Sequence, residues 1–129
     1  MASRSLDDLN PATRLRAQKM MHLAGLAGFN LLVYCTLRGE AEQAELYAQG
    51  RTKPGAIVTW AKPGQSLHQI GAALDLVPLR GGKCVWGRDG ADGVLWQAVG
   101  AIGEQAGLEW AGRWPERKRE YPHFQYKGE

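Results

Sequence analysis

The sequence predicts an α+β fold in which a small, mainly antiparallel sheet is flanked by helices. Two stretches, around residues 8–27 and 95–106, carry apolar residues at the three-and-four spacing of an amphipathic helix. Short apolar runs with β-branched or aromatic residues, at 31–37 and 72–79, are typical of buried strands. These helices and strands are interspersed without a regular β-α-β alternation, and a doubly wound parallel sheet is therefore not expected.

The individual elements follow from the same patterns and from the glycines that punctuate them. In chain order we expect helices at 8–27, 40–49 and 95–106, and strands at 31–37, 57–60, 72–79, 110–114 and 122–126. Gly28, Gly50 and Gly107 directly follow or lie close behind the three helices and are suited to end them.

The bulk composition indicates one ordinary globular domain spanning residues 1–129, which we expect to be a monomer. The chain of 129 residues is 44% apolar and 22% charged, which is typical of a globular protein with one hydrophobic core. Its 17 glycines and 6 prolines predict long ordered loops, where binding sites tend to lie. The net charge of +3 suits nucleic acid, phospholipid or wall polymer, but selects none of them.

The chain offers no apolar segment of the length needed to cross a membrane, which is about 18 residues or more. Asp7, Asp8 and Pro11 stand ahead of a polar, basic stretch, and this N-terminus lacks the apolar core of a signal peptide. We therefore expect the protein to stay in the cytoplasm until something else releases it.

Three residues stand in settings that suit metal chemistry. His68 lies in a loop that leads into the strand predicted at 72–79, and Asp75 interrupts that strand. A lone buried carboxylate is costly unless it is paired, hydrogen-bonded or bound to a metal. His123 follows Pro122 near the last predicted strand. Two imidazoles and one carboxylate, with a fourth position left for water, form a catalytic zinc arrangement. Taken singly, each residue has another interpretation, namely a hydrogen-bonding histidine or an acid that accepts bonds from loop amides.

The remaining histidine and the two cysteines give weaker signals. His22 lies in the first predicted helix without a partner motif and is expected at the surface. Cys35 and Cys84 form no CxxC motif, and their pairing is left open. Cys35 stands in an apolar run and is expected to be a small buried residue.

These separate residues fall into motifs that resemble those of a known protein family. The string Ser66-x-His68-x-x-Gly71-x-Ala73-x-Asp75 resembles the S-x-H-x-x-G-x-A-x-D signature of the M15 zinc peptidases. Glu120-x-x-His123 resembles the distal element of that family, an acid three residues before a histidine. Further blocks resemble the L-alanyl-D-glutamate peptidase branch: Arg38 with Gln43, Leu46-Tyr47-x-Gln49-Gly50-Arg51-Thr52, Val58-Thr59, and Trp110-x-Gly112-x-Trp114. The likeness covers about residues 30–126 in the same order, and the segment 81–93 carries no family mark.

The resemblance implies a Hedgehog/DD-peptidase-like fold and one Zn²⁺ ion bound by His68, Asp75 and His123. It assigns Glu120 as the general base or acid, since such a carboxylate can move a proton without being a metal ligand. It also implies that Arg38 stabilises the oxyanion of the tetrahedral intermediate, although a surface salt bridge is the alternative for that arginine.

For other residues the resemblance leaves two roles open. Arg51 either meets a carboxylate of the substrate or supports the metal loop, and Ser66 either bonds the substrate or shapes a turn. The tryptophans at positions 60, 110 and 114 either line a groove or pack in the core.

The function implied is that of a zinc-dependent peptidoglycan peptidase, a phage or prophage endolysin that cuts L-alanyl-D-glutamate bonds in stem peptides. In this interpretation a holin releases the enzyme to the cell wall. A D,D-carboxypeptidase or dipeptidase of the same family is one alternative. Another is a non-catalytic, zinc-stabilised module whose basic run Arg113-x-x-x-Arg117-Lys118-Arg119 binds wall polymer or nucleic acid. That run has no interleaved aromatic residues to stack on bases, and Glu120 is retained. We therefore expect an enzyme that does not bind nucleic acid.

Overall fold

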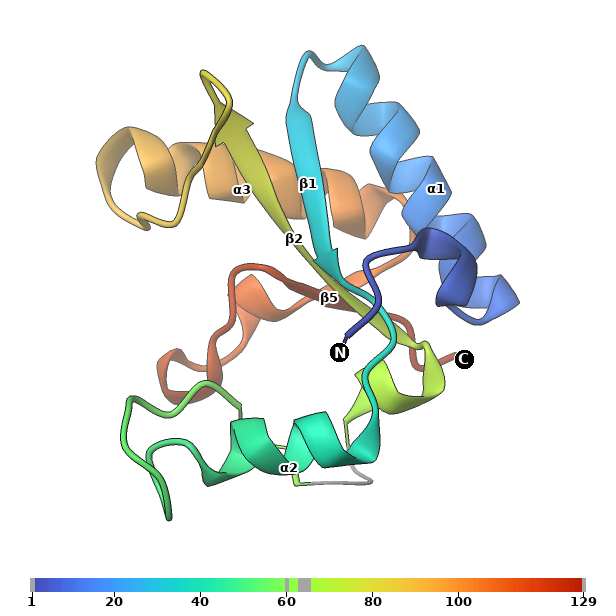
Figure 1. Ribbon diagram of the computed structural model, residues 1–129. Helices are drawn as coiled ribbons and strands as arrows, with labels where there is room; N and C mark the ends of the chain where they lie inside the picture. The colour runs from blue at the N-terminus through green and yellow to red at the C-terminus, as the bar shows by residue number, and fades with distance from the viewer. Residues whose placement is uncertain (1, 60, 63–65, 129) are drawn as a thin grey trace.

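The computed structural model describes residues 2–59, 61–62 and 66–128, and within them a five-stranded sheet is combined with three α-helices (Figure 1). The strands are β1 (Asn30–Cys35), β2 (Ala73–Arg80), β3 (Lys83–Cys84), β4 (Glu109–Trp110) and β5 (His123–Gln125). The helices are α1 (Pro11–Leu26), α2 (Glu40–Ala48) and α3 (Gly90–Gln105), with short 3₁₀ helices η1 (Leu6–Asp8), η2 (Leu67–Ile70), η3 (Ala111–Arg113) and η4 (Glu116–Lys118). Among the described residues, no helix is long and apolar enough to cross a membrane.

The sheet has the order β1-β2-β5-β4, with β3 paired to the end of β2, and every pairing is antiparallel. The α+β class with an antiparallel sheet is therefore confirmed. The register places Asp75 opposite Cys35 of β1 and opposite His123 of β5. Three residues that are far apart in the sequence thus lie side by side across the centre of the sheet.

Strand β2 presents different chemistry on its two faces. Leu74 and Leu76 lie in the hydrophobic core together with Met20 of α1 and Trp96 of α3. Because successive side chains of a strand point to opposite faces, Asp75 points away from the side chains of Leu74 and Leu76. In Figure 1, α1 and α3 lie beside the upper half of the sheet, whereas α2 lies apart, below it. One face of β2 therefore contributes to the core, and the other is available for a polar site.

The first helix begins at Pro11, not at Asp8 as its apolar spacing predicted. Asn10 caps the helix, because its side-chain oxygen accepts a hydrogen bond from the Thr13 amide at 2.9 Å. Proline at the first helical position has no amide hydrogen that would be left without a partner. The residues before this cap form η1 and a turn.

The strand predicted at 57–60 is wrong for residues 57–59, which the structure describes and which form no strand; Trp60 lies outside the described residues. Side chains, and not a neighbouring strand, bond to the backbone of this region. Gln49 donates to the carbonyl of Ala56, and Arg51 donates to that of Thr59. Without a strand edge beside it, the segment stays irregular despite its β-branched residues.

The strand predicted at 110–114 is also wrong beyond Trp110. Only Glu109 and Trp110 pair with β5, and the chain then enters η3. The chain curls back under the indole of Trp110, so closely that a Cβ at Gly112 would overlap the ring. A strand continuing to Trp114 would carry the backbone away from this contact.

Glycines on α3 let the helix approach the sheet closely, and this predicts a stability effect. A Cβ at Gly100 would overlap the buried Trp110 ring. We expect Gly100→Ala to lower the free energy of unfolding by about 1–3 kcal/mol, since the indole must move within a packed core. Urea unfolding followed by circular dichroism measures this change.

Gly25 of α1 provides the matched control, because a Cβ there would meet nothing within 4 Å. Gly25→Ala is expected to raise stability by up to about 1 kcal/mol through helix propensity alone. Equal stability of Gly100→Ala and the wild type would contradict the close packing of α3.

Candidate metal centre and active site

His68 reaches the sheet from η2, which is shaped by two residues of the predicted signature. The Ser66 hydroxyl accepts a hydrogen bond from the His68 amide at 3.2 Å and caps the short helix. Gly71 ends η2 with a φ of 69°, in the left-handed region that favours glycine. A Cβ at Gly71 would also lie 2.8 Å from the backbone nitrogen of Asn10. The local sequence therefore fixes the backbone position from which the His68 side chain reaches the sheet.

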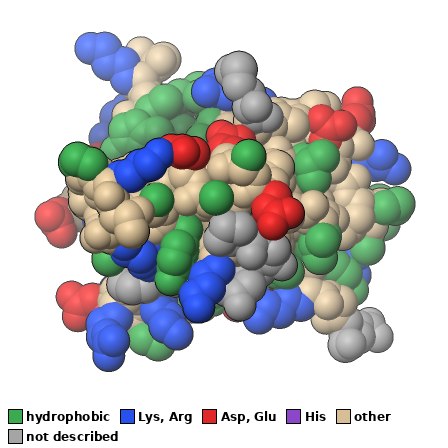
Figure 2. Space-filling model, turned by 60° about the horizontal axis from the view of Figure 1, so that its bottom comes forward, with side chains coloured by type: hydrophobic (Ala, Val, Ile, Leu, Met, Phe, Trp, Pro, Cys, Tyr) green, Lys and Arg blue, Asp and Glu red, His purple; other side chains and the backbone are tan. Residues whose placement is uncertain are grey.

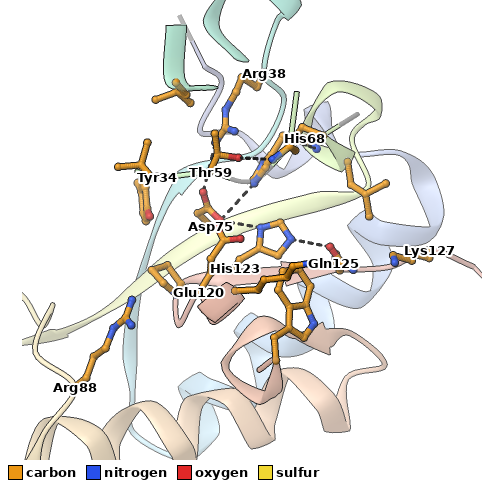
Figure 3. A pocket seen from close by; sticks show the side chains of 18 residues that line it. Tyr34, Arg38, Thr59, His68, Asp75, Arg88, Glu120, His123, Gln125 and Lys127 are labelled. Carbon is orange, nitrogen blue, oxygen red and sulfur yellow. Dashed lines mark hydrogen bonds and ion pairs between the residues drawn. The ribbon is translucent and has the colours of Figure 1, made fainter. Parts of the chain in front are cut away.

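The carboxylate of Asp75 lies between two imidazoles. Its Oδ1 atom is 3.4 Å from Nε2 of His68 and 3.3 Å from Nδ1 of His123. Figure 3 shows both rings directed toward the carboxylate, and their centroids are 5.2 Å apart. The structure thus brings together the three residues that the sequence singles out as metal ligands.

The opposite nitrogen of each imidazole is held by a hydrogen bond. Nδ1 of His68 donates to the carbonyl of Thr36 at 3.0 Å, and Nε2 of His123 donates to Oε1 of Gln125 at 2.8 Å. Partners of this kind set the tautomer of a metal-binding histidine. Nε2 of His68 and Nδ1 of His123 are therefore the atoms that can offer a lone pair toward Asp75. This donor set fits a divalent cation of the zinc type.

The electrostatics of the cluster favour a cation between these side chains. Burial disfavours the charged form of His68, but the Asp75 carboxylate and Cys35 outweigh it and raise the pKa of His68 to about 10. Burial alone would raise the pKa of Asp75, yet the charge of His68 and hydrogen bonds from both imidazoles hold that pKa well below the usual carboxyl range. Without a metal, a proton on His68 therefore balances the charge of Asp75.

Cys35 lies directly behind this cluster. Its sulfur is 3.6 Å from Nδ1 of His68 and accepts a hydrogen bond from Nη2 of Arg38 at 3.3 Å. Cys35, His68 and Asp75 offer ligand atoms within 4.8 Å of one another. The nitrogen of His68 that faces the sulfur is, however, the one that donates to the Thr36 carbonyl, whereas Nδ1 of His123 lies 3.3 Å from Oδ1 of Asp75. Cys35 and Cys84, both in the described part of the chain, are free thiols.

Arg38 borders the cluster on the side opposite His123, and its guanidinium is held in place. Nη2 lies 3.6 Å from Oδ2 of Asp75, and Nη1 donates to Oε1 of Gln43 at 2.6 Å. Gln43 in turn donates to the carbonyl of Ala61 at 2.6 Å. Nε of Arg38 is buried and has no hydrogen-bond partner among the described residues. The guanidinium is therefore held on two sides, by Gln43 and by Asp75.

Glu120 lies beside Asp75 and the imidazole of His123 (Figure 3). It is placed by the turn before β5, where the His123 amide donates to the Glu120 carbonyl at 3.3 Å. Burial raises the pKa of Glu120; the positive charge of His123 opposes the shift and the negative charge of Asp75 adds to it. A carboxyl group with a raised pKa beside a candidate metal site is suited to proton transfer.

These groups share one pocket of about 520 Å³. Six of the seven predicted site residues line it, namely Arg38, Ser66, His68, Asp75, Glu120 and His123. Trp114 also lines the pocket, with its ring 5.5 Å from that of His123, whereas Trp110 is buried in the core. Trp60, the third tryptophan considered, lies outside the described residues. His22 is exposed on α1, as expected.

Arg51 is not among the described residues that line the pocket. Nη1 donates to the carbonyl of Tyr47 at 2.6 Å, and Nη2 donates to that of Thr59 at 3.1 Å. Its guanidinium also lies 3.9 Å from the centroid of the Tyr47 ring. Since Thr59 itself lines the pocket, these contacts favour the supporting role over direct contact with a substrate.

Several polar residues of the pocket, among them Gln125, Tyr34 and Arg88, were not predicted as site residues from the sequence. Gln125 stands two positions after His123 on a predicted strand, and the alternation of side chains could have placed it on the same face. Tyr34 lines the pocket from β1, where burial and then the charge of Asp75 raise its pKa. Arg88 comes from the segment 81–93, where no pattern marks it.

Comparisons with known proteins show the family to which this chain belongs. A family model described as D-alanyl-D-alanine carboxypeptidase, one of the M15 peptidases, matches residues 60–126. The peptidoglycan L-alanyl-D-glutamate endopeptidase CwlK of Bacillus subtilis is 36% identical over 124 residues, which are 92% of this chain and 73% of CwlK. The L-alanyl-D-glutamate peptidase of Listeria phage A118 is 31% identical over 98% of this chain and 42% of its own length.

Solved structures share the fold at lower sequence identity. The L-Ala D-Glu endopeptidase ChiX of Serratia marcescens has a TM-score of 0.71 at 20% identity, covering 98% of this chain and 89% of ChiX. VanYB in complex with D-alanine-D-alanine has a TM-score of 0.66 at 19% identity, covering 93% of this chain and 72% of VanYB. With the family model and CwlK, these findings confirm the resemblance: the chain belongs to the M15 family of peptidases.

Proposed function

We propose that this protein is a zinc-dependent endopeptidase that cuts the L-alanyl-D-glutamate bond in the stem peptides of bacterial peptidoglycan. The observation that carries the proposal is the Asp75 carboxylate oxygen lying within 3.4 Å of one nitrogen on each of two imidazoles, whose opposite nitrogens are held by hydrogen bonds. Glu120 and Arg38 lie in the same pocket. The names of CwlK and of the phage A118 enzyme supply the choice of bond.

His68 through Nε2, His123 through Nδ1 and Asp75 through its carboxylate would hold the metal. When bound there, a zinc ion supplies Lewis acidity and lowers the pKa of water to about 7. The hydrogen bonds from His68 to Thr36 and from His123 to Gln125 orient the rings, so that the ligands need little rearrangement.

Glu120 is positioned to move the proton. In its ionised form the carboxylate takes a proton from the attacking water, and the resulting carboxylic acid returns it to the nitrogen of the departing amine. Burial raises the pKa of Glu120 and brings it closer to neutral pH, which suits a group that must both accept and donate. Glu120 needs no role as a ligand for this.

Arg38 is suited to stabilise the negative oxygen that develops on the scissile carbonyl. Gln43 and Asp75 hold the guanidinium in place, so little reorganisation is needed during the reaction. Arg38 lines the same pocket as Asp75 and Glu120, so such an oxygen would lie beside its guanidinium. Ser66 caps η2 and lines the pocket, so it shapes the site and can also contact the substrate.

The setting of the activity is inferred from the relatives and from the surface. The phage A118 relative favours an endolysin, which we propose to be a monomer that a holin releases to the wall. Figure 2 shows Lys and Arg side chains gathered on the lower part of one face of the molecule. Together with the net charge of +3, this surface suits stem peptides, which carry carboxylates.

The first prediction of this proposal concerns metal content. Purified protein should hold about one equivalent of zinc, and His68→Ala or His123→Ala should lose it because each removes a ligand. His22→Ala is the matched control, since it removes the third, exposed histidine of α1. Elemental analysis measures the bound metal. Full occupancy in both pocket variants would overturn the ligand assignment.

Metal binding should also depend on pH. His68 has a pKa of about 10 without metal, and a ligand must be deprotonated. Zinc must therefore displace a proton at neutral pH, and its apparent affinity should rise as the pH rises. Calorimetric titration in buffers of different ionisation enthalpy measures the protons released. An affinity that stays constant between about pH 6 and pH 8 would argue against His68 as a ligand.

Glu120→Gln tests the proton carrier. The variant should keep zinc and fold but lose about 10²- to 10⁴-fold in kcat/KM. Glu116→Gln, an exposed change in η4, should leave activity unchanged. In the wild type, activity should fall in acid as Glu120 becomes protonated, and its raised pKa should move this loss to a higher pH than an ordinary glutamate would give. Near-normal turnover by Glu120→Gln would place the base elsewhere.

The bond that is cut can be identified from the products. Intact sacculi should release peptides that begin with D-glutamate, and pentapeptide stems should keep their terminal D-alanine. Mass spectrometry of the digests distinguishes the two. Release of free D-alanine as the main product would instead assign the carboxypeptidase activity that the family description names.

A further inference from the structure

The pocket carries three cations that have no carboxylate partner among the described residues. Arg38 is paired with Asp75, whereas Arg88, Lys118 and Lys127 line the same pocket without an ion pair in the described part of the chain. Unpaired cations beside Asp75 and Glu120 attract an anionic group of a substrate, which those two carboxylates would otherwise repel.

The backbone around Arg88 is held firmly although the segment between β3 and α3 has little regular structure. The Val85 amide donates to the carbonyl of Pro78 at 2.9 Å, and the Trp86 ring meets that of Tyr34 edge-on at 5.4 Å.

Two glycines hold the position of Arg88 itself. A Cβ at Gly87 would overlap the carboxylate of Asp92, and a Cβ at Gly93 would overlap the Arg88 carbonyl. The backbone is therefore packed closely on both sides of Arg88, and the point from which this exposed side chain starts is set by the fold.

The guanidinium of Arg88 lies on the side of the pocket that holds Glu120. Its central carbon is 4.9 Å from the centroid of the Tyr121 ring, and Figure 3 shows the side chain pointing toward Glu120. Lys127 lies on the other side, beyond Gln125 (Figure 3). Arg88 is thus a cation that points toward the group which returns the proton to the departing amine.

We propose that Arg88 binds the α-carboxylate of D-glutamate, the residue whose amine departs. This inference rests on the proposed function. In stem peptides D-glutamate continues the chain through its side-chain carboxyl, which leaves the α-carboxylate free. Only the α-carbon separates that carboxylate from the departing nitrogen. When Glu120 reaches the nitrogen, the carboxylate must lie on the same side of the pocket, where Arg88 lies.

An arginine suits this task because its planar guanidinium can donate two parallel hydrogen bonds to one carboxylate. Arg51, the residue that the sequence suggests for such a contact, instead donates to the carbonyls of Tyr47 and Thr59. The structure therefore moves the recognition of D-glutamate from Arg51 to a loop residue without any family mark.

The test uses two synthetic substrates that differ in one group. N-acetyl-L-alanyl-γ-D-glutamyl-L-lysine has the free α-carboxylate, and its D-isoglutamine counterpart carries an uncharged amide there. The zinc-loaded wild type should cut the first with a kcat/KM about tenfold or more above the second, as expected for a hydrogen bond to a charged group. Arg88→Ala should remove this preference by slowing only the first substrate, and Arg88→Lys should restore part of it.

Arg117→Ala is the matched control, because Arg117 is an exposed cation of η4 that does not line the pocket. It should leave the preference intact. Equal loss on both substrates in Arg88→Ala, or an unchanged preference, would overturn the role of Arg88 alone. If the wild type cuts neither substrate but releases D-alanine from pentapeptide stems, the proposed function fails and this inference fails with it.

Discussion

The site depends on one buried charge, the carboxylate of Asp75. Side chains from three other parts of the chain converge on it: His68 from η2, His123 from β5, and Arg38 from the segment after β1. A carboxylate at this depth is stable only because these groups face it. The same neighbours hold the pKa of Asp75 low and raise that of His68. Without a metal, His68 therefore supplies the positive charge that a divalent cation can replace.

The fold supports this charge by separating the two faces of one strand. Leu74 and Leu76 anchor β2 in the core under α1 and α3, while the residue between them faces the pocket. Strand β5 repeats the arrangement, with Phe124 in the core and with His123 and Gln125 in the pocket. A shift of one residue in this pairing would turn the carboxylate of Asp75 or the imidazole of His123 into the core. The packing that stabilises the protein therefore also fixes the geometry of the site.

Three arginines near the pocket differ in what surrounds them. Arg38 is buried and clamped between Gln43 and Asp75, which suits a fixed donor. Arg51 joins the carbonyls of Tyr47 and Thr59 and so holds a wall of the pocket. Arg88 is exposed over Tyr121 and has no carboxylate partner among the described residues. Arginine thus has three different roles here: a candidate oxyanion donor at Arg38, a structural support at Arg51 and a candidate substrate contact at Arg88. The neighbouring groups that the fold brings to each guanidinium decide its role.

The sequence by itself determined the α+β class, the three helices, the two long strands and the spacing of the residues that meet at Asp75. These follow from local periodicity and from a signature whose serine and glycine shape η2 directly. Tertiary structure decided the rest. The segment 57–59 has strand-forming residues but no strand edge to pair with. The segment 111–114 was also predicted as a strand, but the chain there curls under the Trp110 ring. The histidine tautomers, the place of Arg51 and the position of Arg88 depend on hydrogen-bond acceptors and rings that lie far away in the chain. Local sequence cannot encode those partners, because they meet only when the sheet and its loops close around the pocket.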